Sequence, residues 1–301
     1  MDRLLISGIA SPLGERLAAA ASSRMEVCGI DRVAARTLVD GRPLRAFVLD
    51  PRTRRLDDVL GQERPDAIVH FPGTGGTPLD GRVLGDTLRV LEAARDAGVP
   101  QVVVLSSALV YGANNAARPF RDEDAAVATA AGPSRFHAGV APDVAAALFG
   151  AQHIETRVAV LRAVGTLGHR AASGLGLLLQ PGLVPLTLGH DPLIQLLHSD
   201  DLVEALLAAA RHGLRGVFNV SGPDPLPLSL AVQESGGSAV PLPSRALRAS
   251  ARLGFGWSSF DLDFLVEPCT VSGHRFVAAT GFTPRWTLHD LFKETRDAIA
   301  A

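Results

Sequence analysis

Short apolar segments alternate with longer amphipathic segments along the first half of the chain. The apolar segments are rich in β-branched residues, and they lie at residues 3–7, 25–30, 44–49, 66–71, 101–105 and 157–161. Segments of this length and composition are typical of buried parallel strands. Residues 13–21 and 85–97 lie between them, and the second of these carries Leu88, Leu91 and Ala94 at helical spacing. Strands that alternate with helices predict an α/β fold with a doubly wound parallel sheet.

This alternation stops after residue 161, where segments rich in Gly and Pro follow. We therefore expect a main domain at residues 1–165, to which residues 194–222 return. Within this return, Ser199 or Asp200 is expected to cap a helix that ends near Arg211, and a strand is expected at residues 216–220. Residues 166–193 and 223–301 are predicted to form a second, smaller α/β lobe that binds the substrate.

Composition narrows the class of protein. The chain has 301 residues, 47% of them hydrophobic, and a net charge of −2, which disfavours nucleic-acid and membrane-surface partners. Two cysteines, Cys28 and Cys269, are too few for a disulfide framework or a zinc site. The sequence contains no apolar run long enough to span a membrane and starts without the apolar region of a signal peptide. The cytoplasm is the expected compartment, and the oligomeric state stays open.

The segment SGIASPLGERLAAA joins the first predicted strand to the first helix, which is the context that a dinucleotide-binding loop requires. Gly8 permits a tight turn, and Gly14 lets the helix pack close to the strand. Ser11 stands where the middle glycine of the fingerprint would be, and Pro12 suits a first helical turn. Backbone N–H groups near Leu13 can point at a pyrophosphate. The alternative is an ordinary glycine-containing turn.

Acidic residues at the ends of the second and third strands support a nucleotide site. Asp31 has the spacing at which a carboxylate accepts hydrogen bonds from an adenosine ribose. Its charge favours NAD, whereas Arg32 directly after it can bind the 2′-phosphate of NADP, so the preference between the two stays open. Asp50 can bond the adenine amino group, and a turn cap before Pro51 is the alternative.

These motifs stand in an order that resembles the extended short-chain dehydrogenase/reductases of the NAD-dependent epimerase/dehydratase group. The resemblance covers most of the chain and includes SGIASPLG, LDPRT, PDAIVHFPG, SSALVYG, VLRAVGTLG, QLLHSDDLVEALL and GFTPRW. It implies a Rossmann fold, an NAD(P)H cofactor and a cofactor-facing turn at Phe71, Pro72 and Gly73. It also implies that Ser107, in SSALVYG, bonds the reacting carbonyl or hydroxyl oxygen; a structural serine at the end of a strand is the alternative.

The family's YxxxK pair, which transfers the proton, is missing. Phe136 stands in place of the tyrosine and Val140 in place of the lysine. The chain's single tyrosine, Tyr111, belongs to VYG, and its single lysine, Lys293, lies near the C-terminus. We expect Tyr111 to pack beside the pocket, and His137 is the candidate substitute for the missing acid because imidazole titrates near neutral pH.

Reduction of a ketone is the chemistry that this loss harms least, because a substrate phenol or water can supply the proton. QLLHSDD lacks the arginine with which the family's sugar-nucleotide enzymes hold a diphosphate, and most arginines elsewhere, including Arg162, Arg170, Arg275 and Arg285, are expected at the surface. The smaller lobe carries a group of leucines that are expected in the core, although some of them can line an apolar substrate pocket. The group is Leu175, Leu177, Leu178, Leu179, Leu183, Leu186 and Leu188. We therefore predict an NAD(P)H-dependent ketoreductase of an apolar, aromatic polyketide-type ketone, by analogy with angucyclinone ketoreductases of antibiotic biosynthesis. A non-catalytic dinucleotide-binding regulator and a divergent sugar-nucleotide epimerase or dehydratase are the alternatives.

Overall fold

The computed structural model describes residues 1–35, 44–73, 82–112, 120–128, 134–168, 179, 183–243, 245–247 and 270–300. Its centre is a seven-stranded sheet in the order β11-β6-β5-β4-β1-β2-β3, in which every neighbouring pair is parallel. The strands are β1 (Arg3–Ser7), β2 (Glu26–Asp31), β3 (Arg45–Val48), β4 (Ala67–His70), β5 (Gln101–Ser107), β6 (Arg157–Ala163) and β11 (Gly216–Val220). The chain order reverses between β1 and β4, so the ends of these two strands form the topological switch point at which such sheets bind ligands.

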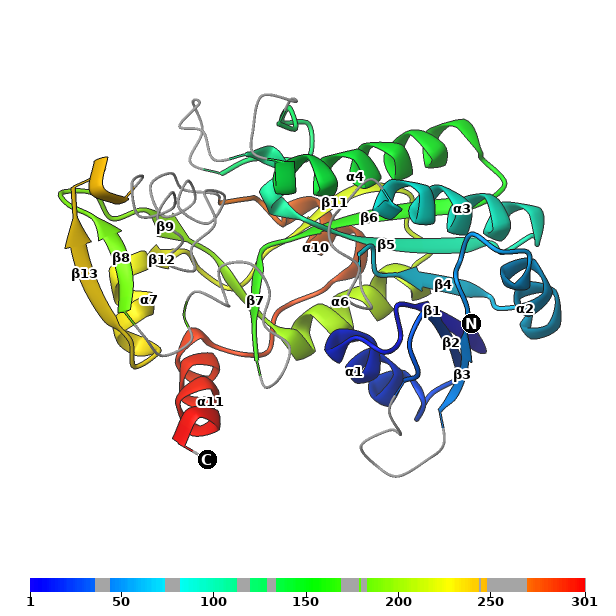
Figure 1. Cartoon of the computed structure of the whole chain (residues 1–301), viewed down its shortest axis with the longest axis horizontal. Coiled ribbons are helices and arrows are strands. Elements are labelled where there is room, and N and C mark those ends of the chain that lie inside the picture. Colours follow the sequence, from blue (N-terminus) through cyan, green and yellow to red (C-terminus); the bar gives the residue numbers. More distant parts are fainter. Residues whose placement is uncertain are drawn as a thin grey trace.

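Helices cover both faces of the sheet (Figure 1). They are α1 (Pro12–Ala21), α2 (Arg55–Glu63), α3 (Arg82–Asp96), α4 (Ser134–Gln152) and α6 (Ser199–Arg211). Successive residues of β1 point to opposite faces of the sheet. Ile6 packs in one core cluster with Leu17 of α1 and Leu206 of α6. Leu5 packs in the other cluster with Leu91 of α3. The predicted doubly wound α/β sheet is therefore confirmed.

The element boundaries differ from the prediction by a few residues, and one cap was wrong. Neither Ser199 nor Asp200 caps α6, because the N-cap residue is His198, whose ring Nδ1 accepts the Asp200 N–H at 3.1 Å. The ring is held in this position by Trp286, which stacks on it at 3.7 Å, and by Glu294, whose carboxylate lies 2.6 Å from Nε2. The cap thus depends on the C-terminal segment, which the local sequence does not reveal.

Beyond the main sheet, the described residues form three two-stranded sheets. They are β7 (Gly165–Leu167) with β10 (Leu196–His198), β9 (Leu193–Ile194) with β12 (Leu226–Pro227), and β8 (Leu183–Thr187) with β13 (Ser238–Leu242). The other helices named in the described part of the chain are η1 (Ala108–Tyr111), α7 (Leu228–Glu234), α10 (His274–Thr280) and α11 (Leu288–Ala300). Because β11 joins the main sheet and α6 covers it, much of 194–222 returns there; the domain division at residue 165 stays a prediction.

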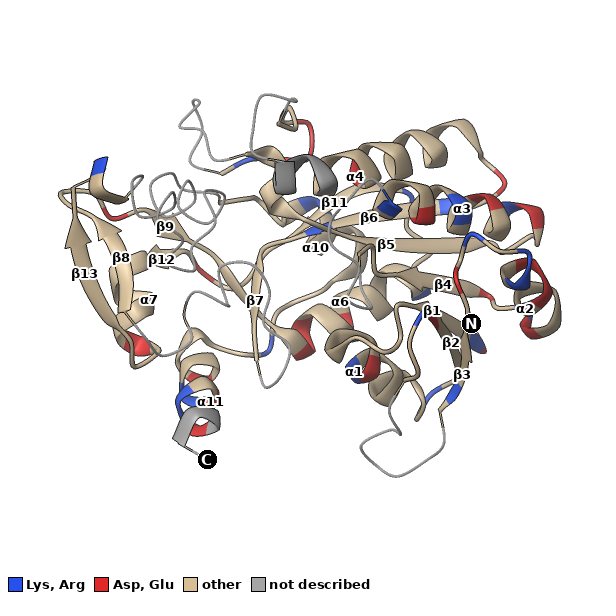
Figure 2. Ribbon diagram, viewed as in Figure 1, with Lys and Arg blue, Asp and Glu red and all other residues tan. Residues whose placement is uncertain are grey.

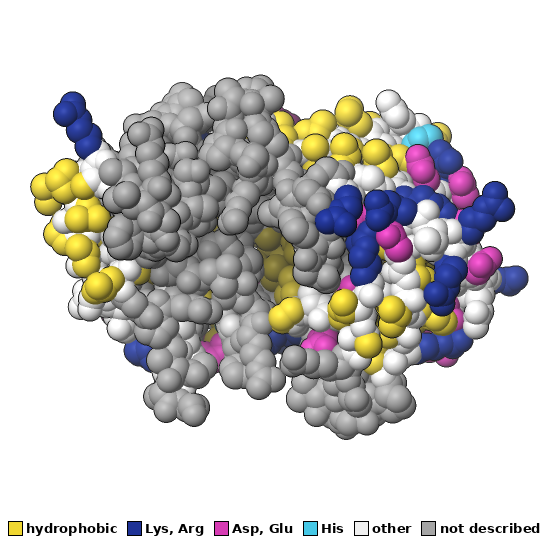
Figure 3. All heavy atoms as spheres, viewed as in Figure 1, with side chains coloured by type: hydrophobic (Ala, Val, Ile, Leu, Met, Phe, Trp, Pro, Cys, Tyr) yellow, Lys and Arg dark blue, Asp and Glu magenta, His cyan; other side chains and the backbone are white. Residues whose placement is uncertain are grey.

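Charged and apolar side chains are unevenly distributed. Figure 2 shows many positions of both signs on α2 and α3, whereas β5 has none. Figure 3 shows an apolar patch over β8 and β13 at the left edge of the molecule. Leu183 and Leu188 are exposed there, at 67% and 64%, whereas Leu179 and Leu186 are buried. The leucine-rich segment is thus core in part and surface in part; Leu175, Leu177 and Leu178 lie outside the described residues.

Candidate functional site

The loop between β1 and α1 is a tight turn held by its own side chain. Gly8 has a φ of 93°, a conformation that favours glycine. The Ser11 hydroxyl donates to the Gly8 carbonyl at 2.7 Å and accepts the Gly14 N–H at 3.0 Å, which makes Ser11 the N-cap of α1. Pro12 is the first helical residue, where its missing N–H leaves no bond unmade. The serine in place of the middle glycine therefore closes the turn.

Close packing places this turn where a phosphate can approach. A Cβ atom on Gly14 would lie 2.4 Å from the Gly8 carbonyl oxygen, so only glycine fits there. The neighbouring N–H groups are used within the fold: those of Gly8 and Ser11 by backbone carbonyls, and that of Gly14 by the Ser11 hydroxyl. Within the described residues, the Leu13 N–H has no partner. A free N–H in the first turn of a helix fits an anionic group such as a pyrophosphate.

Asp31 ends β2 beside this loop and is only 6% exposed. One carboxylate oxygen accepts the Ala10 N–H at 3.0 Å, and the other accepts the Arg32 N–H at 2.7 Å. A carboxylate has about four acceptor positions, so capacity is left for a ribose hydroxyl. The carboxylate that is predicted to bind the ribose thus contacts the loop that is predicted to bind the phosphates.

Arg32 and Asp50 contact each other at the ends of β2 and β3. The Arg32 guanidinium donates to Asp50 at 3.1 Å and to Asp86 of α3 at 2.8 Å. Asp50 also accepts the Arg52 N–H at 3.0 Å, which is the turn-cap arrangement, and Pro51 is buried in that turn. The hydrogen bond from the Arg52 side chain holds the pKa of Asp50 well below its usual range. Sequence spacing did not reveal Asp86.

The end of β4 packs under the glycine loop. His70 is buried, with Nδ1 2.9 Å from the Ser7 hydroxyl and Nε2 3.1 Å from the Thr87 hydroxyl. Because the Thr87 hydroxyl donates to the Val83 carbonyl, we infer that it accepts from Nε2 and that Ser7 donates to Nδ1. Burial lowers the pKa of His70 to about 4, so the ring is neutral.

The predicted cofactor-facing turn follows His70 directly. Phe71 is buried, and its N–H donates to the Ser7 carbonyl at 2.9 Å, which continues the pairing of β4 with β1. Pro72 is half-buried and Gly73 has a φ of 75°. The turn therefore starts at the switch point, beside the glycine loop.

Three hydroxyl groups lie at the end of β5 and in η1, and they differ in what holds their protons. Ser106 donates to Asp143 at 2.6 Å, and Tyr111 donates to the Asn219 side-chain oxygen at 2.8 Å. Ser107 accepts the Leu109 N–H at 3.2 Å, and the part of the chain that the structure describes holds no acceptor for its proton. Ser107 is thus the hydroxyl that can donate to a substrate oxygen.

Tyr111 is buried, at 1% exposed, and its position beside a substrate pocket stays a prediction. Burial raises the pKa of its phenol, which opposes a role as a proton donor in catalysis.

Arg162, by contrast, is not at the surface, so the expectation for it was wrong. It is 5% exposed, forms an ion pair with the buried Asp143 at 2.6 Å and donates to the Tyr111 hydroxyl at 3.0 Å. Asp143 lies on α4 and Arg162 on β6, so only packing brings them together. An arginine within an apolar strand that needs a buried counter-charge was the available signal.

The other residues of the missing proton pair are placed only in part. Phe136, His137 and Val140 belong to α4, but the side chains of Phe136 and His137 lie outside the described part of the structure. Lys293 is exposed on α11. The catalytic assignment of His137 therefore stays a prediction.

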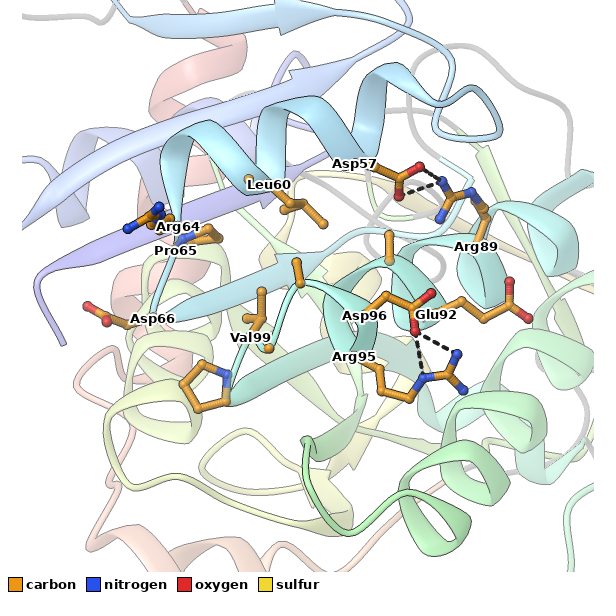
Figure 4. A pocket seen from close by; sticks show the side chains of 15 residues that line it. Asp57, Leu60, Arg64, Pro65, Asp66, Arg89, Glu92, Arg95, Asp96 and Val99 are labelled. Atoms are coloured by element: carbon orange, nitrogen blue, oxygen red, sulfur yellow. Dashed lines mark hydrogen bonds and ion pairs between the residues drawn. The ribbon is translucent and has the colours of Figure 1, made fainter.

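A cleft of about 820 Å³ lies between α2 and α3, where residues 64–66 and 98–100 lead into the amino ends of β4 and β5 (Figure 4). Two pairs of its charged lining residues bond each other: Arg89 bonds Asp57 at 2.6 Å and Arg95 bonds Asp96 at 2.7 Å. Because the glycine loop follows the carboxyl end of β1, this cleft lies at the opposite edge of the sheet. It is thus separate from the candidate nucleotide site.

Searches of the described residues for other kinds of site gave negative results. None of the described helices combines the length and apolarity needed to cross a membrane. The described residues also contain no group of three or more His, Cys, Asp or Glu side chains that could hold a metal ion.

Known proteins resemble this chain in sequence and in fold. An uncharacterized protein of Mycobacterium tuberculosis is 26% identical over 265 residues, which cover 81% of this chain and 69% of that protein. UDP-glucose 4-epimerase of Thermus thermophilus, solved with NAD, superposes with a TM-score of 0.75 at 18% identity over 99% of both chains. dTDP-glucose 4,6-dehydratase of Bacillus anthracis, also with NAD, gives 0.77 at 14% identity over 100% of this chain and 97% of that one. Because residues 4–221 match its sequence description, the chain belongs to the NAD dependent epimerase/dehydratase family.

Proposed function

We propose that this protein is an NAD(P)H-dependent ketoreductase that acts on an apolar, aromatic ketone. The observation that carries the proposal is a free Ser107 hydroxyl in a chain that lacks the family's tyrosine and lysine. The sole tyrosine is buried and bonded to Asn219, and the sole lysine lies on α11. Such a site can orient a carbonyl but has no built-in phenol to exchange its proton.

The residues of the glycine loop and of β2 are those that would hold the cofactor. The Leu13 N–H fits the pyrophosphate, and Asp31 fits the adenosine ribose. When bound, a reduced nicotinamide supplies a hydride, and the ketone oxygen then requires one proton. Ser107 donates a hydrogen bond to that oxygen, while a phenol beside the carbonyl or a water molecule supplies the proton. Family membership and the NAD-bound structural relatives support the cofactor assignment.

The direction of the reaction follows from the same loss. Oxidation of an alcohol, with which sugar epimerisation starts, needs a base to remove the hydroxyl proton. Reduction needs only a proton that the substrate can carry. A ketone with a neighbouring phenol is therefore the substrate class that fits this site best, because it brings its own proton donor.

The test is oxidation of NADH by the purified protein with pairs of aromatic ketones, one bearing a phenol beside the carbonyl and the other its methyl ether. We expect turnover of the phenol to be faster by about tenfold or more, since a positioned acid contributes at least that much. Ser107→Ala should lower kcat/KM about 100-fold, as loss of one donor to a developing oxyanion does. The control Ser23→Ala, on the surface after α1, should change nothing.

Two results would contradict the proposal. One is the absence of cofactor oxidation across the panel with both NADH and NADPH. The other is full activity of Ser107→Ala, which would remove the hydroxyl assigned to the substrate oxygen. Replacement of Phe136 by leucine is expected to leave turnover intact, because a phenyl ring transfers no proton.

A sugar-nucleotide epimerase or dehydratase is the second candidate, because the structural relatives named above carry those names. This chain, however, lacks the tyrosine and lysine pair that transfers the proton in that chemistry, and the described part of the fold supplies no replacement for the pair. Thermal unfolding with UDP-glucose and dTDP-glucose distinguishes the two, since a ligand that binds the native state raises the unfolding temperature. A shift with either sugar nucleotide would favour this candidate.

A further inference from the structure

Two arginines and two carboxylates meet where the adenosine end of a dinucleotide would lie. We call Arg32, Asp50, Arg52 and Asp86 the adenosine-side cluster. Arg32 bonds Asp86 at 2.8 Å and Asp50 at 3.1 Å, while Arg52 bonds Asp50 at 2.8 Å and lies 3.5 Å from Asp86. Each arginine thus contacts both carboxylates, and the cluster connects β2, β3 and α3.

Burial makes the bond between Arg32 and Asp86 hard to give up. The Asp86 side chain is 7% exposed and that of Arg32 is 25% exposed. A buried carboxylate that loses its cation is left uncompensated, which is strongly unfavourable. Arg52 lies farther from Asp86, at 3.5 Å, and is itself 46% exposed, so it replaces Arg32 poorly. Arg32 therefore stays bonded to the carboxylates unless a ligand binds its guanidinium more strongly than they do.

The charge around Arg32 is unfavourable for a second phosphate. Asp31 precedes it and, together with the cluster, places three carboxylates against two guanidinium groups. NADP differs from NAD by a phosphate on the adenosine 2′-oxygen, the position beside the ribose-binding carboxylate. That phosphate would meet the Asp31 charge, while Nη2 of Arg32 is already bonded to both Asp50 and Asp86 and holds the guanidinium on these carboxylates.

We propose that Asp86, together with Asp50, withholds Arg32 from the adenosine 2′-phosphate and so makes the nucleotide site select NAD(H) over NADP(H). This inference rests on the nucleotide site of the proposed function and on none of its ketone chemistry. Asp86 is then a positioning residue that acts through Arg32. An arginine directly after the acidic residue is a feature that favours NADP in the sequence, and here the fold cancels it.

The experiment measures dissociation constants of NADH and NADPH for the full chain by calorimetric titration without substrate. The wild type should bind NADH more tightly by on the order of 100-fold, from repulsion between a phosphate and a carboxylate a few ångströms apart. Asp86→Asn keeps the size of the side chain but removes its charge and frees Arg32. It should tighten NADPH binding about tenfold and change NADH binding less than about threefold.

Asp57→Asn is the matched control. It removes the same charge from an ion pair with Arg89 at the far cleft (Figure 4), so the ratio of the two constants should stay at the wild-type value.

Several results would overturn the inference. Equal dissociation constants of NADPH and NADH for the wild type would overturn it before any variant is tested. An unchanged ratio in Asp86→Asn contradicts the role given to Asp86. Failure of the wild type to bind either dinucleotide overturns both this inference and the proposed function. A negative ketone assay with selective NADH binding overturns the proposed function alone.

Discussion

His70 lies at the carboxyl end of β4, and burial lowers the pKa of its imidazole from 6.5 to about 4. Its two nitrogens are used by the hydroxyls of Ser7 and Thr87, so the native fold requires the neutral ring. The unfolded chain exposes the imidazole to water and takes a proton as the pH falls below 6.5. Below that pH the unfolded state binds more protons than the native state, so acid favours unfolding.

The magnitude follows from the two pKa values. The free energy of unfolding should fall by up to about 1.4 kcal/mol per pH unit between 6.5 and 4. Over the whole interval His70 accounts for about 3 kcal/mol, a large fraction of the 5–15 kcal/mol that is roughly typical of a native protein. This stability is fully present above pH 6.5 and is lost as the pH approaches 4.

The assay is urea unfolding followed by tryptophan fluorescence at a series of pH values from about 7 to about 4.5, for the wild type and His70→Gln. The amide of Gln keeps a donor for Thr87 but does not titrate. The stability difference between wild type and variant should therefore shrink steadily as the pH falls. His190→Gln, at an exposed histidine after β8, is the control that should follow the wild type throughout. A constant difference between the wild type and His70→Gln at all pH values would refute the reasoning.

Three further substitutions test other parts of the structure. Tyr111→Phe leaves the Asn219 oxygen without its donor, so it should lower stability by about 1–3 kcal/mol while turnover persists; loss of turnover alone would make Tyr111 an acid. Gly14→Ala puts a Cβ atom 2.4 Å from the Gly8 oxygen, so it should lower stability by about 1–3 kcal/mol and weaken NADH binding in the same titration. Arg64→Gly relieves a φ of 46° at the end of α2 and should raise stability by about 0.5 kcal/mol in urea unfolding, whereas a loss would show that the arginine side chain is needed there.

The sequence by itself determined the fold class and the missing proton pair. Alternation of apolar and amphipathic segments predicted six strands of the main sheet and β11 as its later return, because both faces of a parallel sheet must be covered. The lack of a tyrosine and lysine pair needs no structure, since a chain with one of each, far apart in sequence, cannot form the motif.

Local patterns failed where a side chain takes its role from a distant partner. The cap of α6 was assigned to Ser199 or Asp200, because both are good caps, yet His198 fills the position with Trp286 and Glu294 packed on it. Expected at the surface, Arg162 is instead buried on Asp143.

Only the tertiary structure decided which charges meet. Arg32 and Asp86 are 54 residues apart, and Tyr111 and Asn219 are 108 apart, so no periodicity or spacing relates them. The hydrophobic pattern specifies which face of each strand or helix is buried, because residues two apart share a face of a strand and residues three or four apart share a face of a helix. The packing of the layers decides which polar groups meet in the buried space. It places Arg32 against carboxylates and leaves the Ser107 hydroxyl proton without an acceptor among the described residues.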